Sequence, residues 1–205
     1  MIARRSVLLL PLVAAACSDD QAAPRTFLIP SYGFLSPIRF NVASIEIDDR
    51  APPSTERSLD QVSTFRLADG LRQIVNDRLV AVGSTGRAVF VIDAASLMRV
   101  PGGIEGTLAV HLDVFAGPSG ERAGYAEARV ARRRTSTDVN EDSRAVLYDF
   151  AVQMLNDMNV EFEFQAKRSL RDWLQAAPTT VPPAGPIQSE PLGAPARLAP
   201  SLRGR

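Results

Sequence analysis

Cysteine and histidine are nearly absent from this sequence, which limits both how the chain is stabilised and what chemistry it can perform. The 205 residues include one cysteine, Cys17, and one histidine, His111. No intramolecular disulfide can form, so stability must come from a packed apolar core. A metal site with several histidine ligands is excluded, and a Ser-His-Asp triad would depend on His111 in a chain without the G-x-S-x-G motif. These absences favour a non-catalytic protein.

A long apolar run and an excess of basic residues are also lacking. The apolar run from Val7 to Val13 is shorter than the about 20 residues that a membrane-spanning helix needs, and Pro11 interrupts it. Lysine and arginine number 23, as do aspartate and glutamate. Nucleic-acid binding usually requires a basic excess, so no nucleic-acid partner is predicted.

The first 17 residues, MIARRSVLLLPLVAAAC, have the order of a secretory signal: two arginines, an apolar run and small residues. The stretch from Ala14 to Cys17 resembles a lipobox, whose cysteine receives diacylglycerol on sulfur and a fatty acid on its new amino group. Because Cys17 is the only cysteine, we predict that it is lipidated and anchors the chain in a membrane. The alternative is cleavage after an Ala-x-Ala site that leaves Cys17 unmodified. Arg4 and Arg5 leave general secretory and twin-arginine export both open.

The signal also predicts where the protein works and how the chain is divided. Ser18 follows the cysteine and, by analogy with enterobacterial lipoproteins, favours the periplasmic face of the outer membrane, with the inner membrane as the alternative. Seven of the 15 prolines lie between Pro178 and Pro200, which is typical of an unfolded tail. We therefore expect a signal peptide at 1–16, a lipidated tether at 17–37, a folded domain at 38–175 and a disordered tail at 176–205.

Apolar spacing predicts the elements of the domain. Residues 38–48 alternate as a strand with a slip near Ala43, and a stripe with three- and four-residue spacing predicts a helix over 59–82. Ser58 with Gln61 predicts a capping box at the start of this helix, and Gly83 predicts its end. Later come a strand over 87–100, a hairpin of strands over 107–115 and 121–135, and a second helix from the predicted cap Asp138 to Trp173.

The order strand, helix, three strands, helix predicts the fold class. Two long helices that cover one face of a small, mostly antiparallel sheet give a two-layer α+β domain. Met154 and Met158 fall on the apolar stripe of the second helix and are expected in the core, with a lipid-lined groove as the alternative. In the tether, Phe27, Leu28, Tyr32, Phe34 and Leu35 are expected to lie on the domain.

A tethered cysteine followed by a β-α-β-β-β-α core resembles the small envelope lipoproteins typified by the lipopolysaccharide-assembly lipoprotein and the auxiliary lipoprotein of ABC-type envelope transporters. The stretches SYGFLSPIRFNVASIEI, GSTGRAVFVI and NVEFEFQAKRSLRDWL also resemble an alphaproteobacterial lipoprotein group. The resemblance extends over about Ser31 to Leu174. The motifs that carry it are descriptive and not catalytic, so they say little about activity. From the lipobox, the absent catalytic set and the proline-rich tail we expect an envelope protein partner, with a lipid as the alternative partner.

Charged residues supply the remaining candidates. Arg129, Arg132, Arg133 and Arg134 either protect a solvated sheet edge from aggregation or contact anionic lipid headgroups, lipid A phosphates or an acidic partner. His111 is expected on a sheet face. Carboxylates at strand ends are expected to be solvated, with cation binding or acid-base catalysis as the alternative; they are Glu46, Asp48, Asp49 and Asp93.

The favoured function is therefore a membrane-anchored periplasmic lipoprotein that acts as a non-catalytic accessory or scaffold in envelope assembly or lipid transport. No cofactor and no metal are predicted. Two other classes remain open at this stage. One is a lipid-binding carrier with an apolar pocket between helices and sheet, and the other is a carboxylate-dependent hydrolase.

Overall fold

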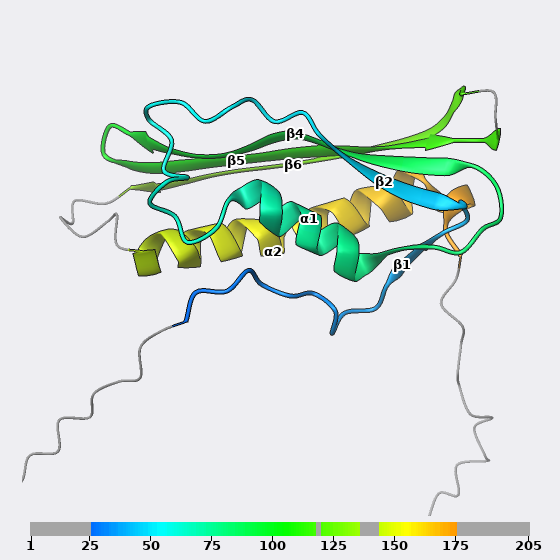
Figure 1. Cartoon of the computed structure of the whole chain (residues 1–205), viewed down its shortest axis with the longest axis horizontal. Coiled ribbons are helices and arrows are strands. Elements are labelled where there is room, and N and C mark those ends of the chain that lie inside the picture. The colour runs from blue at the N-terminus through cyan, green and yellow to red at the C-terminus, as the bar shows by residue number, and fades with distance from the viewer. Residues whose placement is uncertain (1–25, 118–119, 136–143, 176–205) are drawn as a thin grey trace, which may run out of the picture.

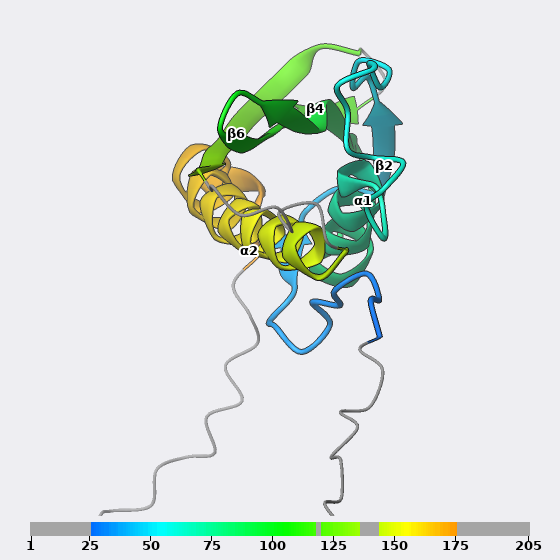
Figure 2. The same ribbon diagram turned by 90° about the vertical axis from the view of Figure 1, so that its left-hand side faces the viewer.

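The computed structural model describes residues 26–117, 120–135 and 144–175. The predictions for the signal peptide, Cys17, the Asp138 cap and the proline-rich tail lie outside these residues. Within them, the predicted α+β class is confirmed: α1 (Leu67–Arg78) and α2 (Arg144–Ser169) cover one face of a four-stranded sheet (Figure 1). Figure 2 shows both helices on the same side of that sheet. No described helix is both long enough and apolar enough to span a membrane.

The four-stranded sheet is mixed, in the order β2-β4-β5-β6. Its first pair, β2 and β4, is parallel, and the other two pairs are antiparallel. The predicted hairpin is confirmed, although the middle strand begins at Gly103 because Gly102 and Gly103, with φ of 74° and 153°, turn the chain directly into it. The strands are β2 (Ser44–Asp49), β4 (Arg87–Val100), β5 (Gly103–Phe115) and β6 (Arg122–Thr135).

The first predicted strand, 38–48, is in fact two strands in two different sheets. β1 (Ile38–Phe40) pairs in parallel with β3 (Leu79–Ala81), whereas β2 pairs with β4. The chain passes between the sheets at a tight turn in which the Val42 amide donates to the Phe40 carbonyl at 2.9 Å. The change in apolar parity near Ala43 therefore marks the passage of the chain from one sheet to the other.

The first helix is shorter than the predicted 59–82. Residue Leu59 instead donates its amide to the Leu97 carbonyl at 2.8 Å and lies along the edge of β4. The helix begins after Arg66, which makes no side-chain cap, so the capping box of Ser58 and Gln61 does not form. The last residues of the predicted helix, Leu79–Ala81, form strand β3 because they pair with β1. The helix ends at Arg78, so Gly83 does not terminate it.

The second helix follows its predicted stripe closely. Helix α2 runs without interruption through Asn156 and Asn159, and the 3-10 helix η2 (Arg171–Trp173) follows it after Leu170. The stripe residues are buried against the sheet; they are Leu147, Phe150, Met154, Met158 and Phe162. The prediction that the two methionines belong to the core is confirmed.

The core fills the space between the sheet and the helices. Alternate residues of β5 face the helices and are fully buried, among them Leu108, Val110 and Leu112. Glycine at position 106 permits α2 to approach closely, since a Cβ there would lie 2.1 Å from the Met154 sulfur. Two pockets of the described residues, one beside β4 and one beside the last turns of α2, lie outside this space.

Candidate functional site

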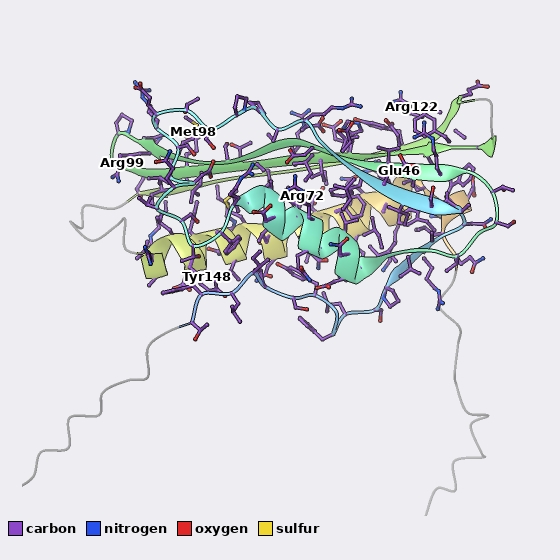
Figure 3. The ribbon with its side chains drawn as sticks, in the orientation of Figure 1. Glu46, Arg72, Met98, Arg99, Arg122 and Tyr148 are labelled. Atoms are coloured by element: carbon purple, nitrogen blue, oxygen red, sulfur yellow. The ribbon has the colours of Figure 1, made fainter. Side chains whose placement is uncertain are left out.

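The sheet face that the helices leave uncovered, here called the outer face, carries most of the predicted candidates. Successive side chains of a strand point to opposite faces, so Glu46 and Asp48 of β2 lie on the outer face, while Asp49 points toward α1. Asp49 accepts a hydrogen bond from Arg72 at 2.6 Å. Figure 3 shows Arg72 on α1, below the sheet, whereas Glu46 lies on β2 at its edge. The predicted group of three carboxylates is therefore not brought together.

The two remaining carboxylates of this group each have a basic partner. Glu46 lies 3.4 Å from Arg87, and Asp48 accepts a hydrogen bond from Arg50 at 2.7 Å. In each pair both side chains are more than two-fifths exposed. Pairs of this kind are well solvated and contribute at most about 1 kcal/mol to stability.

The centre of the outer face is occupied by His111, in agreement with its predicted position on a sheet face. Its Nδ1 lies 2.6 Å from the Asp93 carboxylate, and its Nε2 lies 3.6 Å from that of Asp113. Asp93 reaches the ring because it is the extra residue where the register of β4 and β5 shifts between Ile92 and Ala94. Both candidate residues were identified from the sequence, but their contact depends on this bulge.

Next to the histidine, β6 contributes a chain of hydrogen bonds. The Tyr125 ring centroid lies 5.6 Å from that of His111, and the Tyr125 hydroxyl donates to Glu127 at 2.8 Å. Arg129 donates to the other oxygen of Glu127. We call Asp93, His111, Asp113, Tyr125, Glu127 and Arg129 the outer-face cluster.

The outer-face cluster contains three groups whose charges are stable near neutral pH. Hydrogen bonds from Arg129 and then from Tyr125 lower the pKa of Glu127, and the bond to Glu127 raises the pKa of Arg129. Burial, followed by the hydrogen bond to Glu127, raises the pKa of Tyr125. Glu127 therefore stays ionised, Arg129 stays charged and the Tyr125 hydroxyl keeps its proton, so this part of the cluster provides fixed hydrogen bonds.

The four candidate arginines lie along β6, which forms an edge of the sheet, but on alternating faces. Arg129 is on the outer face and is held by Glu127. Arg132 is on the helix side, where its Nε donates to Asp157 of α2. Arg133 donates to the Pro101 carbonyl at 2.8 Å. The four guanidinium groups therefore do not converge on one anion, and their contact with a ligand or partner stays a prediction.

Sequence reasoning missed Arg78, which is the most deeply buried charged residue of the described chain, with 2% of its surface exposed. Its three donor groups reach three residues in two other segments of the chain. Nε donates to the Ser36 carbonyl at 3.0 Å, Nη1 donates to Asn159 at 2.6 Å, and Nη2 pairs with Glu163. Arg78 thus joins α1 to α2 and to the segment before β1. Only Glu163 carries a sequence signal, a four-residue spacing to Lys167 on one helix face, and these two side chains form an ion pair.

An apolar pocket lies beside β4, under the loop that follows β2. Pro52, Pro53, Ala94 and Met98 contribute to its lining, and its volume is about 190 Å³. Ligand pockets usually measure about 300–1,000 Å³, so this one is small for a lipid. It also lies outside the space between helices and sheet, where a carrier was expected to hold its ligand. The geometry does not favour the carrier hypothesis.

Comparison with known proteins gives similarities of fold. Neither a family model nor a curated protein matches the chain. A protein from Xanthomonas campestris is similar over 69% of this chain and 91% of its own, with 12% identity and a TM-score of 0.36. A lipoprotein from Neisseria meningitidis is similar over 56% of this chain and 99% of its own, with 9% identity and a TM-score of 0.28. A minor lipoprotein from Acinetobacter baumannii is similar over 65% of this chain and 96% of its own, with 15% identity and a TM-score of 0.27. Fold similarity of this degree assigns no ligand or activity.

Proposed function

We propose that this protein is a lipid-anchored lipoprotein of the bacterial envelope that acts as a non-catalytic accessory or scaffold in envelope assembly or lipid transport. The observation that carries the proposal is the lipobox-like stretch Ala14 to Cys17, which contains the only cysteine of the chain and follows a secretory signal. Acyl chains on Cys17 provide the membrane attachment, at the periplasmic face of the outer membrane.

The outer face supports a scaffold role because the helices leave it uncovered (Figure 2) and because charged residues of three strands lie on it, such as Asp93, Asp113 and Glu127. Several of its charges have intramolecular partners, such as Asp113 with Arg122 at 3.1 Å. Charge patterns of this kind contribute to partner specificity and association rate more than to affinity. We infer that the arginines of β6 extend this surface toward an acidic envelope protein.

The environment of His111 supports a structural role for this residue. Its Nδ1 lies within hydrogen-bond distance of Asp93, at 2.6 Å, and this contact links two neighbouring strands. Its Nε2 lies 3.6 Å from Asp113, beyond hydrogen-bond distance. The ring is 15% exposed. We propose that His111 joins β4 to β5 on the outer face through its contact with Asp93.

Anchoring is tested with Cys17→Ser in the chain that retains its signal. We expect the wild-type protein to incorporate a labelled fatty acid and to fractionate with membranes, and the variant to lose the label. Incorporation of label by the variant, or an unlabelled wild-type protein, would contradict lipidation of Cys17.

The scaffold role is tested by crosslinking in cells with Arg129→Glu/Arg133→Glu. We expect this pair to lose a crosslinked envelope protein that wild type retains. The control Arg50→Glu reverses a charge at the end of β2, where the Arg50 side chain is 64% exposed, and should retain the crosslink. Absence of any specific crosslink from wild type would contradict the scaffold, and retention by both variants would exclude the β6 edge as the contact.

A further inference from the structure

Large apolar side chains are exposed on the surface of the helix layer that faces away from the sheet. Figures 1 and 2 show residues 26–37 running along this surface beneath the helices. Five of the eight exposed large apolar side chains of the described residues belong to this segment or to α2, so they are concentrated on this side. They are Leu28 (68% exposed), Ile29 (39%), Phe34 (82%), Val160 (67%) and Phe164 (56%). We call these five residues the anchor-side surface.

The segment that carries Phe34 is fixed in place, so the exposure of this ring is a stable feature. The Tyr32 amide donates to Asp77 of α1 at 2.6 Å, and the Tyr32 hydroxyl donates to Asn156 of α2 at 2.9 Å. Tyr32 itself is 3% exposed. The prediction that the tether residues lie on the domain is thus right for Tyr32, and also for Phe27, whose ring meets that of Tyr148, and Leu35, which packs against the core. It is wrong for Phe34 and Leu28, which are mostly exposed. Clustered exposed apolar groups mark protein or membrane contact sites.

A basic groove adjoins the anchor-side surface. It lies between residues 36–39 and the last turns of α2, and its volume is about 430 Å³. Arg39, Lys167 and Arg171 line it, with Glu163 as the one carboxylate. Glu163 is already bound to Arg78 and Lys167. An anion in the groove would therefore meet an excess of positive charge.

Two of the groove cations lack an ion-pair partner among the described residues, namely Arg39 and Arg171. A basic residue in the last turn of a helix interacts favourably with the helix dipole, and this interaction is sufficient to explain Lys167. It does not explain Arg39, which belongs to β1, or Arg171, which lies beyond the end of α2. Planar guanidinium groups are well suited to phosphate oxygens.

The position of the predicted lipid anchor, Cys17, indicates that a membrane is the ligand of this surface. Cys17 precedes Thr26, the first described residue, by nine residues. A chain of nine residues reaches at most about 30 Å. Acyl chains on Cys17 therefore keep Thr26, where the described segment begins, within about 30 Å of the bilayer. The anchor-side surface continues from there along the helix layer, so it is held near lipid headgroups at a high effective concentration.

We propose that the anchor-side surface and the groove together bind an anionic membrane, with a phospholipid headgroup phosphate between Arg39 and Arg171 and with Phe34, Val160 and Phe164 at the interface. This inference rests on the proposed lipid anchor. It turns the outer face of the sheet away from the membrane, toward the periplasmic partner. The domain would then have one surface for lipid and one for protein.

The test uses the mature chain from residue 17 with Cys17→Ser, so that no acyl chain contributes to binding. Co-sedimentation is measured with vesicles of phosphatidylglycerol and phosphatidylcholine, and with phosphatidylcholine alone. We expect binding to the anionic vesicles, and a partition coefficient about 30-fold lower for Arg39→Gln/Arg171→Gln, since each basic contact with an anionic surface contributes about a five-fold effect. Fatty-acid labelling of Cys17 is measured separately, so failure of the anchor and failure of this surface are distinguishable.

Two further variants test the specificity of this effect. For each variant, a wild-type circular dichroism spectrum shows that the domain is still folded. Arg50→Gln/Arg122→Gln removes the same charge from side chains that are 64% and 56% exposed on the outer face and should bind as wild type does. Phe34→Ser/Phe164→Ser should bind more weakly. Equal loss in both arginine pairs, or no preference of wild type for anionic vesicles, would overturn the proposal. Self-association that Phe34→Ser/Phe164→Ser abolishes would instead assign the surface to a second copy of the chain.

Discussion

Replacement of Arg78 by methionine should destabilise the domain by about 3 kcal/mol. Methionine nearly preserves the volume of the buried side chain, so the cavity contribution is small. Most of the loss comes from Asn159, which is 6% exposed and loses a donor, at about 1–3 kcal/mol for an unsatisfied buried group. The Ser36 carbonyl also loses a donor, but Ser36 is exposed, so water can replace this bond and the added cost is small. Removal of one partner from a fully buried pair costs about 3–5 kcal/mol. The effect at Glu163 should be smaller, because this side chain is 30% exposed and retains Lys167.

The matched control is Arg72→Met on the same helix. Arg72 pairs with Asp49 at 2.6 Å and with Asp69 at 2.7 Å, but its side chain is 36% exposed. Solvent screening limits the value of such pairs to about 1 kcal/mol. Urea unfolding of the mature Cys17→Ser chain, followed by circular dichroism, gives both free energies if the m-values agree. Equal shifts in the unfolding midpoint for Arg78→Met and Arg72→Met would refute the reasoning from burial.

Two more predictions concern the core and the response to pH. Gly106→Ala should lower stability by about 1–3 kcal/mol in the same assay, because its Cβ would lie 2.1 Å from the Met154 sulfur, whereas Gly33→Ala, with no atom closer than 3.8 Å, should change it little. Burial would raise the pKa of Glu163, but hydrogen bonds from Lys167 and Arg78 outweigh it and lower this pKa below its ordinary 4.5. The contribution of Glu163 to the free energy of unfolding is therefore fully present above about pH 4.5, and it is lost as the pH falls through the lowered pKa. The urea midpoint should fall less steeply between pH 5 and pH 3 in Glu163→Gln, and identical slopes would contradict this assignment.

Elements with an uninterrupted local pattern were predictable from the sequence. The residues 87–100 were expected as a strand and form β4, and the stripe through Met154 and Phe162 was expected to bury one face of a helix and does so in α2. In both cases the side-chain period of the element, two for a strand and 3.6 for a helix, is contained in the residues themselves. The same two-residue period places the side chains of Arg132 and Arg133 on opposite faces of β6.

The candidate site depended on contacts that no local period describes. Asp93 meets His111 because one residue of β4 is left without a partner in β5, and a bulge is a property of the paired strands. Likewise, β3 replaces the last predicted turns of α1 because β1 is available to pair with it. Propensity is a weak preference that such tertiary pairing overrides.

The sequence by itself determined the predicted export signal with Cys17, the α+β class and the core faces of the long elements. Only the tertiary structure decided that Arg78 is buried among three segments and that Arg39 lies beside Arg171. The physical reason is that burial and charge pairing depend on which distant segments become neighbours. That choice is made by the packing of the whole domain, whereas hydrophobic periodicity records only which side of each element faces inward.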